Sequence, residues 1–364
     1  MMRLQKLMLV AAAAGAFAAC KKDSDPVIVI PPSSGAQVQL NGLVGTEAGS
    51  SAGNAVFLDL STDKQTALAR ASWDLGFYSG SDFRVILNNT ASAGAKVLTK
   101  NDLTAVGASD TVGLTLATSQ TAPSSDQLAY FDDIAGDLTK NVIPAVSATD
   151  ADNKVIILNR GTGGSIPARA WVKLRVLRNA SGYTLQYAGI QETTFKTLSI
   201  AKDDLYHFKL VSIDNGVLAN GFPEKDKWDI TWSYSVFQTD FGGGMVPYNF
   251  SDLIAVNYLA GVTVAQKQYY NSSSTAKDSA TVASAAYAAF NKDSVAKTTF
   301  VTGRWTIGSN WRSTQPATGA RLDRIYIIKD AAGNYYKLRC LSMGVGSDGG
   351  TRGKPEFKYE LISK

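Results

Sequence analysis

The sequence predicts an all-β protein made of two similar antiparallel units, each with one or two short helices. Most of the chain consists of short runs of β-branched and aromatic residues separated by Gly, Asn, Asp and Ser, which is the pattern of hairpins. A phrase also recurs, because residues 72–77 read SWDLGF and residues 227–232 read KWDITW. Residues 1–37 have a different composition and predict a secretion signal followed by a tether.

Residues 1–19 are predicted to be a signal peptide. Arg3 and Lys6 give a positive start, residues 7–14 are an apolar run too short to span a bilayer, and small residues precede Cys20. A cysteine directly after such a segment resembles a bacterial lipobox. We therefore expect Cys20 to carry the acyl chains that anchor a lipoprotein. The alternative is an ordinary signal peptide with a coincidental cysteine.

Residues 20–37 are predicted to be the lipidated cysteine and a flexible tether. The sequence KKDSD at 21–25 resembles the charged signal that directs some lipoproteins to the outer face of the outer membrane. Prolines and small polar residues at 26–37 favour an extended segment. We thus expect a surface-exposed protein anchored by lipid in the outer membrane, with its folded part starting near Val38.

The remaining chain is interpreted as two β-rich units, at residues 38–200 and 201–364. Predicted strands occupy residues 55–61, 83–88, 154–159, 171–178 and 183–190, and then 207–213, 228–234, 324–330, 335–343 and 357–362. Predicted helices occupy residues 126–140 and 279–293. Each half thus has a Trp-Asp phrase, a helix and a late hairpin in the same order, although chance similarity of two β-rich halves is an alternative.

The Trp-Asp phrases predict a structural role. Alternation along a strand places the rings of Trp73, Phe77, Trp228 and Trp232 in the core, and the aspartate can accept backbone amides from the adjoining loop.

Charge and composition exclude several functions. The formal net charge is +5, and removal of Arg3 and Lys6 with the signal leaves 34 basic and 31 acidic residues, a net +3, with no basic block for nucleic acid. With Cys20 lipidated, Cys340 has no disulfide partner and is expected to be a buried thiol. A single histidine argues against a zinc site. No Gly-x-Ser-x-Gly elbow occurs, and carboxylates are scattered, so we expect no enzyme.

Several phrases, taken in order, resemble the HmuY-like lipoproteins. They include FLDLSTDKQTALARASWDLGF at 57–77, IGSNWR at 307–312 and DRIYIIKDAAGNYYKLRCLSM at 323–343. The resemblance implies an all-β fold, haem as the cofactor, and presentation of that haem to a cognate outer-membrane transporter. It also implies that side chains such as paired histidines, or methionines, hold the iron.

Ligands for haem iron are few in this chain. A pair of histidines within one chain is impossible, because His207 is the only histidine. The candidates that the resemblance suggests for the iron are His207, Met245 and Met343, with Tyr248, Trp305 and Trp311 as ring-stacking neighbours. A dimer that brings two copies of His207 to one iron is an alternative.

A second hypothesis uses the same scaffold without haem. Aromatic faces stack on sugar rings, so Trp305, Trp311, Tyr269 and Tyr270 are candidates for binding a glycan, a peptide or a partner protein. The sequence leaves open the ligand, the number of units that bind it and the oligomeric state.

Overall fold

The computed structural model describes residues 31–218, 221–269 and 276–364. Residues 32–364 form one compact unit. The signal peptide, Cys20 and the tether up to residue 30 lie outside the described residues. The first strand starts at Gly35, three residues before the predicted start of the folded part.

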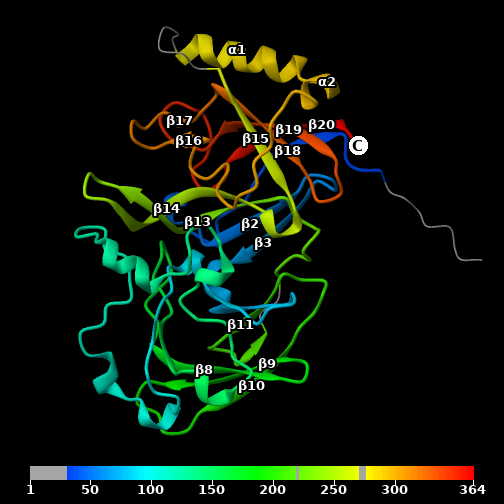
Figure 1. Ribbon diagram of the computed structural model, residues 1–364. Helices are drawn as coiled ribbons and strands as arrows, with labels where there is room; N and C mark the ends of the chain where they lie inside the picture. Colours follow the sequence, from blue (N-terminus) through cyan, green and yellow to red (C-terminus); the bar gives the residue numbers. More distant parts are fainter. Residues whose placement is uncertain (1–30, 219–220, 270–275) are drawn as a thin grey trace, which may run out of the picture. The chain divides into compact units, whose positions relative to one another are not determined.

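Four antiparallel sheets make up most of the unit (Figure 1). The first outer sheet has the order β1 (Gly35–Gln39), β20 (Glu356–Ser363), β19 (Tyr335–Ser342), β18 (Arg324–Lys329), β15 (Thr263–Gln268). The first inner sheet has the order β14 (Met245–Val256), β13 (Ile230–Asp240), β2 (Asn54–Asp59), β3 (Lys64–Ala69). The second inner sheet has the order β12 (Val217–Leu218), β11 (Phe208–Ser212), β4 (Leu75–Tyr78), β5 (Val85–Leu87). The second outer sheet has the order β10 (Lys196–Ala201), β9 (Gly182–Gly189), β8 (Val172–Asn179), β7 (Ile156–Asn159), β6 (Gly94–Val97).

Three apolar clusters lie between these sheets. One, which includes Trp232 and Phe357, packs the first outer sheet on the first inner sheet. Another, which includes Phe77 and Tyr183, does the same for the second pair. The third cluster, which includes Phe57, joins the two inner sheets, and the candidate functional site lies there. The all-β fold class predicted from the sequence is confirmed.

The two outer sheets have corresponding strand orders, and so do the two inner sheets. Three of the four sheets also take strands from both halves of the chain, because β1 pairs with β20, β2 pairs with β13 and β11 pairs with β4. Strand β10 crosses the expected boundary at residues 200–201. The division into two tandem units therefore remains a prediction.

The two Trp-Asp phrases occupy corresponding places. The amide of Asp74 donates to the carbonyl of Val211 at 2.8 Å, and the amide of Asp229 donates to the carbonyl of Leu58 at 2.9 Å. Each carboxylate then accepts the amide two residues further on, Ile213 N for Asp74 and Leu60 N for Asp229, both at 2.8 Å. The aspartates thus accept backbone amides, but the donors lie at the end of a neighbouring strand and not in the adjoining loop, where the sequence predicted them.

A matching asparagine completes each arrangement. The side-chain amide of Asn88 donates to the carbonyl of Trp73 at 2.7 Å, and that of Asn257 donates to the carbonyl of Trp228 at 2.8 Å. These bonds set a correspondence between the halves that pairs Leu58 with Val211 and Asn88 with Asn257.

All ten predicted strands are present. The sequence did not predict several other strands, namely β1, β3, β6, β10, β12, β14 and β15. Two further short strands, β16 (Arg312–Ser313) and β17 (Gly319–Ala320), form a separate ribbon.

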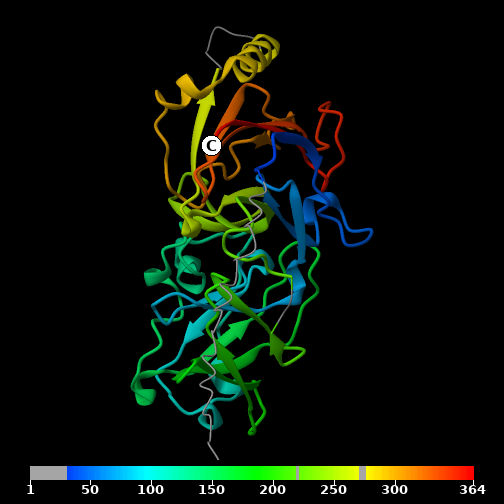
Figure 2. The same ribbon diagram turned by 90° about the vertical axis from the view of Figure 1, so that its right-hand side faces the viewer.

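One of the two predicted helices is an α-helix. Helix α1 (Ala276–Ala289) and the short α2 (Lys292–Val295) cover residues 279–293 and lie beside the first outer sheet (Figure 2). The helix predicted at 126–140 is wrong, since that segment holds only 3₁₀ turns at Ser125–Tyr130 and Leu138–Lys140. Its middle instead turns the Asp132 carboxylate inward to accept the amides of Leu87 and Val142, at 2.6 and 3.1 Å.

Candidate functional site

A cavity of about 130 Å³ lies between the two inner sheets. Its apolar walls come from both halves of the chain, and many of them are corresponding residues. They include Trp73 and Trp228, Ala55 and Phe208, Ile86 and Ala255, and Leu87 and Val256. We call this space the interior cavity.

Aromatic rings form one wall of the interior cavity. The Phe57 ring meets Trp228 edge to face at a centroid distance of 5.0 Å and Phe222 at 5.4 Å. Trp73 and Phe208 are buried and line the same space. Trp73 and Trp228, expected in the core, thus border a cavity, whereas Phe77 and Trp232 are core residues.

Charged groups line one side of the interior cavity. Burial raises the pKa of Asp132 to about 6, although its two backbone amide donors partly oppose that shift. Arg304 lines the same side, and burial lowers the pKa of its guanidinium against the opposing influence of Tyr258, Asp132 and Asp133. An apolar cavity with a few convergent polar groups is typical of a small-molecule site.

His207 borders the interior cavity and is 8% exposed. The amide nitrogen of Asn257 donates to the carbonyls of Lys225 and Trp228, both at 2.8 Å, so its other atom, 3.2 Å from His207 Nε2, is the oxygen. His207 Nε2 must therefore carry a proton and donate it. Burial lowers the His207 pKa, which keeps the ring neutral near pH 7. The Nδ1 lone pair is left without a hydrogen-bond partner among the described residues.

A second space lies on the other side of His207. This surface depression of about 300 Å³ is lined by Tyr78, Tyr206, Lys225 and Asp226, among others. His207 and Leu259 border both spaces. They form the wall between the interior cavity and the surface depression.

Two buried polar atoms beside the interior cavity have no partner in the described part of the chain. These are the indole nitrogen of Trp228, a donor, and the amide oxygen of Asn89, an acceptor. Buried polar atoms are nearly always paired in folded proteins, so an unpaired donor and an unpaired acceptor at one cavity indicate that something else satisfies them.

The other candidate ligands do not meet at His207. Met343 is 0% exposed in the cluster between the first outer and first inner sheets, and Met245 is 44% exposed at the start of β14. Trp311 is also 0% exposed, and its indole nitrogen donates to the carbonyl of Asp252 at 2.8 Å. Neither Met343 nor Trp311 offers a face to a ligand.

Tyr248 and Trp305 belong to a different feature, a row of half-buried and exposed rings that runs along the β13–β14 hairpin and ends at Trp305, in the loop after α2. Successive edge-to-face contacts at 5.3 to 5.8 Å join the rings of Phe241, Tyr248, Phe250, Phe237 and Trp305. Phe241, at the end of this row, is 64% exposed. Tyr269 packs beside Tyr287 under α1, and Tyr270 lies outside the described residues.

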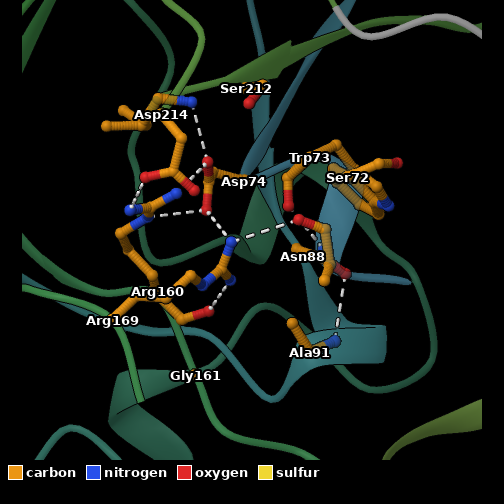
Figure 3. A network of polar contacts seen from close by, with 12 residues as sticks. Ser72, Trp73, Asp74, Asn88, Ala91, Arg160, Gly161, Arg169, Ser212 and Asp214 are labelled. Atoms are coloured by element: carbon orange, nitrogen blue, oxygen red, sulfur yellow. Dashed lines mark hydrogen bonds and ion pairs between the residues drawn. The ribbon is translucent and has the colours of Figure 1, made fainter. Parts of the chain in front are cut away.

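A buried ion network lies at the Asp74 end of the second inner sheet (Figure 3). Arg160 donates to both carboxylate oxygens of Asp74, at 2.9 and 3.0 Å, and also bonds Asp214. Arg169 lies 3.0 Å from the same carboxylate. Among the described residues, the corresponding Asp229 has no such cation, and burial raises its pKa to about 8, with Asp59 and Asp330 adding to the rise.

Sequence reasoning found His207 but missed Asp132, Arg304 and Asn89. The pair of aspartates at 132–133 was the only local signal, and it fell in a segment interpreted as helix. In the described ranges, no cluster of three or more His, Cys, Asp or Glu side chains is placed to hold a metal ion, and no helix is long and apolar enough to cross a membrane.

The fold and the interior cavity define an all-β protein with an aromatic cavity of small-molecule size. Comparison with protein families then gives the narrower assignment. The family model described as HmuY protein matches residues 51–359, so the chain belongs to the HmuY family. The matched range includes residues of both predicted units. No curated protein and no solved structure matches the chain.

Proposed function

We propose that this protein is a cell-surface binding protein that holds haem, or a related small ligand, against His207 for uptake. The single observation that carries the proposal is the neutral imidazole of His207, whose Nδ1 lone pair has no partner in the described chain while Nε2 donates to Asn257. Metal-bound histidines commonly donate their second ring nitrogen in this way, which fixes the tautomer and the ring orientation.

The size of the two spaces favours the surface depression for haem. Small-molecule pockets usually measure about 300 to 1,000 Å³, and the depression reaches the lower end of that range. The interior cavity, at about 130 Å³, is too small for a porphyrin. Lys225 at the depression is a counter-charge for a haem propionate, although Asp204 and Asp226 line it as well. Haem iron would supply the coordination bond, and His207 would hold and orient it.

Haem titration of the purified protein tests this proposal. We expect a shifted Soret band at micromolar haem, and we expect His207→Ala to weaken binding at least tenfold and move the band. Met245→Leu is the matched control, because Met245 lies at an exposed strand end. The stoichiometry separates one haem per chain from a haem shared by two chains. An identical spectrum and affinity in His207→Ala would reject His207 as a ligand.

We also propose that Cys20 is lipidated, that the chain is anchored in the outer membrane, and that a cognate transporter receives the ligand. The arrangement of the N-terminus supports the anchor, since a short apolar run and small residues precede Cys20. Cys20→Ser should move the protein from the membrane fraction to the soluble fraction, whereas Cys340→Ser should not. Recovery of both variants with the membrane would contradict the proposal.

The ring row on β13–β14 favours a second candidate function, binding of a glycan, a peptide or a partner protein. Its exposed Phe241 continues into Tyr248, and both rings can stack on a flat ligand. Glycan binding that is lost in Phe241→Ala, in a protein that gives no Soret shift with haem, would replace the first proposal with this one.

A further inference from the structure

The interior cavity is walled by small residues at two places where the other half of the chain has large ones. The bonds of the Asp74 and Asp229 amides align Leu58 with Val211, and three residues earlier on each strand this alignment pairs Ala55 with Phe208. The bonds of Asn88 and Asn257 align those two residues, and two residues earlier this alignment pairs Ile86 with Ala255. All four residues line the cavity. Ala55 is smaller than its counterpart Phe208, and Ala255 is smaller than its counterpart Ile86. The two alanines leave room between the inner sheets.

Two of the residues that line the cavity carry an unpaired donor and an unpaired acceptor. Trp228 Nε1 and Asn89 Oδ1 are buried and lack partners in the described ranges. A wholly apolar guest would leave both atoms unpaired, while a guest with a hydroxyl group could accept from the indole and donate to the amide oxygen. The remaining wall, from Phe57, Trp73 and Phe208, suits one aromatic ring.

We infer that the interior cavity is a separate binding site for a phenol-class molecule, one aromatic ring that carries a hydroxyl group. The size agrees, because an apolar cavity of about 150 Å³ accepts benzene. This site is distinct from the one proposed for haem, which lies across the wall formed by His207 and Leu259. Binding of a phenol-class molecule can therefore be tested independently of haem binding.

Titration calorimetry of the mature protein with phenol and with toluene tests the inference. We expect phenol to bind at least tenfold more tightly than toluene, because only phenol satisfies Trp228 Nε1 and Asn89 Oδ1. In Asn89→Leu, the affinity for phenol should fall to that for toluene. Absence of phenol binding at millimolar concentration, or equal affinities in the unaltered protein, would overturn the inference.

Variants that fill the interior cavity test whether phenol binds there. Ala255→Ile and Ala55→Phe, which introduce the residues of the other half, should each abolish binding of both molecules. Ala201→Ile, at an exposed position of β10, is the matched control and should leave affinity unchanged. Thermal melting confirms that each variant is folded, and agreement of two independent fillings excludes a local defect. Undiminished phenol binding in both folded filling variants would place the guest elsewhere and refute the inference.

Discussion

The same substitution at Asp74 and Asp229 should have opposite effects on stability. Both aspartates occupy corresponding places and accept a strand-end amide at 2.8 Å. Their charge environments differ, since Arg160 and Arg169 surround Asp74 while Asp59 and Asp330 stand near Asp229. Replacement of each by asparagine keeps the shape and removes the charge.

At Asp74 the loss of charge is costly. Asp74 and Arg160 are buried, and the carboxylate binds the guanidinium through two bonds. Removal of one partner of a buried ion pair leaves an uncompensated charge and typically costs about 3 to 5 kcal/mol. Asp214 still pairs with Arg160, so we expect about 3 kcal/mol for Asp74→Asn.

At Asp229 the substitution becomes increasingly favourable as the pH rises above about 4. The folded-state pKa of about 8 exceeds the ordinary value of 3.8, so the folded protein keeps a proton that the unfolded chain releases. The stabilisation this proton gives is complete below about pH 4 and is lost as pH rises to about 8. The free energy of unfolding falls over that window by up to about 1.4 kcal/mol per pH unit. Asp229→Asn removes this dependence.

Urea unfolding followed by tryptophan fluorescence at pH 5 and pH 8 measures both effects. Asp74→Asn should be less stable than the parent at both values. Asp229→Asn should become more stable relative to the parent between pH 5 and pH 8 by about 2 to 4 kcal/mol. Three pH units at about 1.4 kcal/mol per unit set the upper end of that range. Equal destabilisation by the two variants at pH 8, or a difference at Asp229 that does not change with pH, would refute the reasoning.

Three further predictions concern the core. Ala255→Ile adds three apolar carbons to the wall of the interior cavity, at about 0.8 kcal/mol each, so it should raise the melting temperature, and a lower one would show that the cavity cannot accept the side chain. Buried Arg70 donates to four backbone carbonyls. Arg70→Met should therefore lower the free energy of unfolding, measured with urea, by about 3 kcal/mol, and a loss under about 1 kcal/mol would contradict this. Burial raises the pKa of the Cys340 thiol, so iodoacetamide should modify this thiol only in denaturant. Mass spectrometry measures the modification, and rapid labelling of the native protein would contradict the prediction.

The strands were predictable because their signal is local. Alternating β-branched and aromatic residues mark each of the ten that were predicted, and Gly333, at φ +93°, gives the tight return of the predicted late hairpin, between β18 and β19. The pairing was not predictable. Strand β1 joins a sheet built from the other half, β2 pairs with β13 across the halves, and no periodicity along one strand identifies its partner.

The site was less predictable than the fold. His207 could be singled out only because it is unique, and its tautomer depends on Asn257, 50 residues away. Asp132 was assigned to a helix because helix propensity ignores the two distant amides that hold its carboxylate. The cavity itself arises from Ala55 and Ala255, and a small residue in a strand carries no signal until its neighbours are known.

The pairing of β1 with β20 has a consequence for the order of events during synthesis. Gln39 and Glu356 lie in register although 317 residues separate them. At roughly 5 to 20 residues per second, the ribosome needs on the order of twenty seconds to a minute to cover that interval. Throughout it the earliest strand has an unsatisfied edge, the kind of surface on which nascent chains aggregate or recruit chaperones. The first strand to be made must wait for the last.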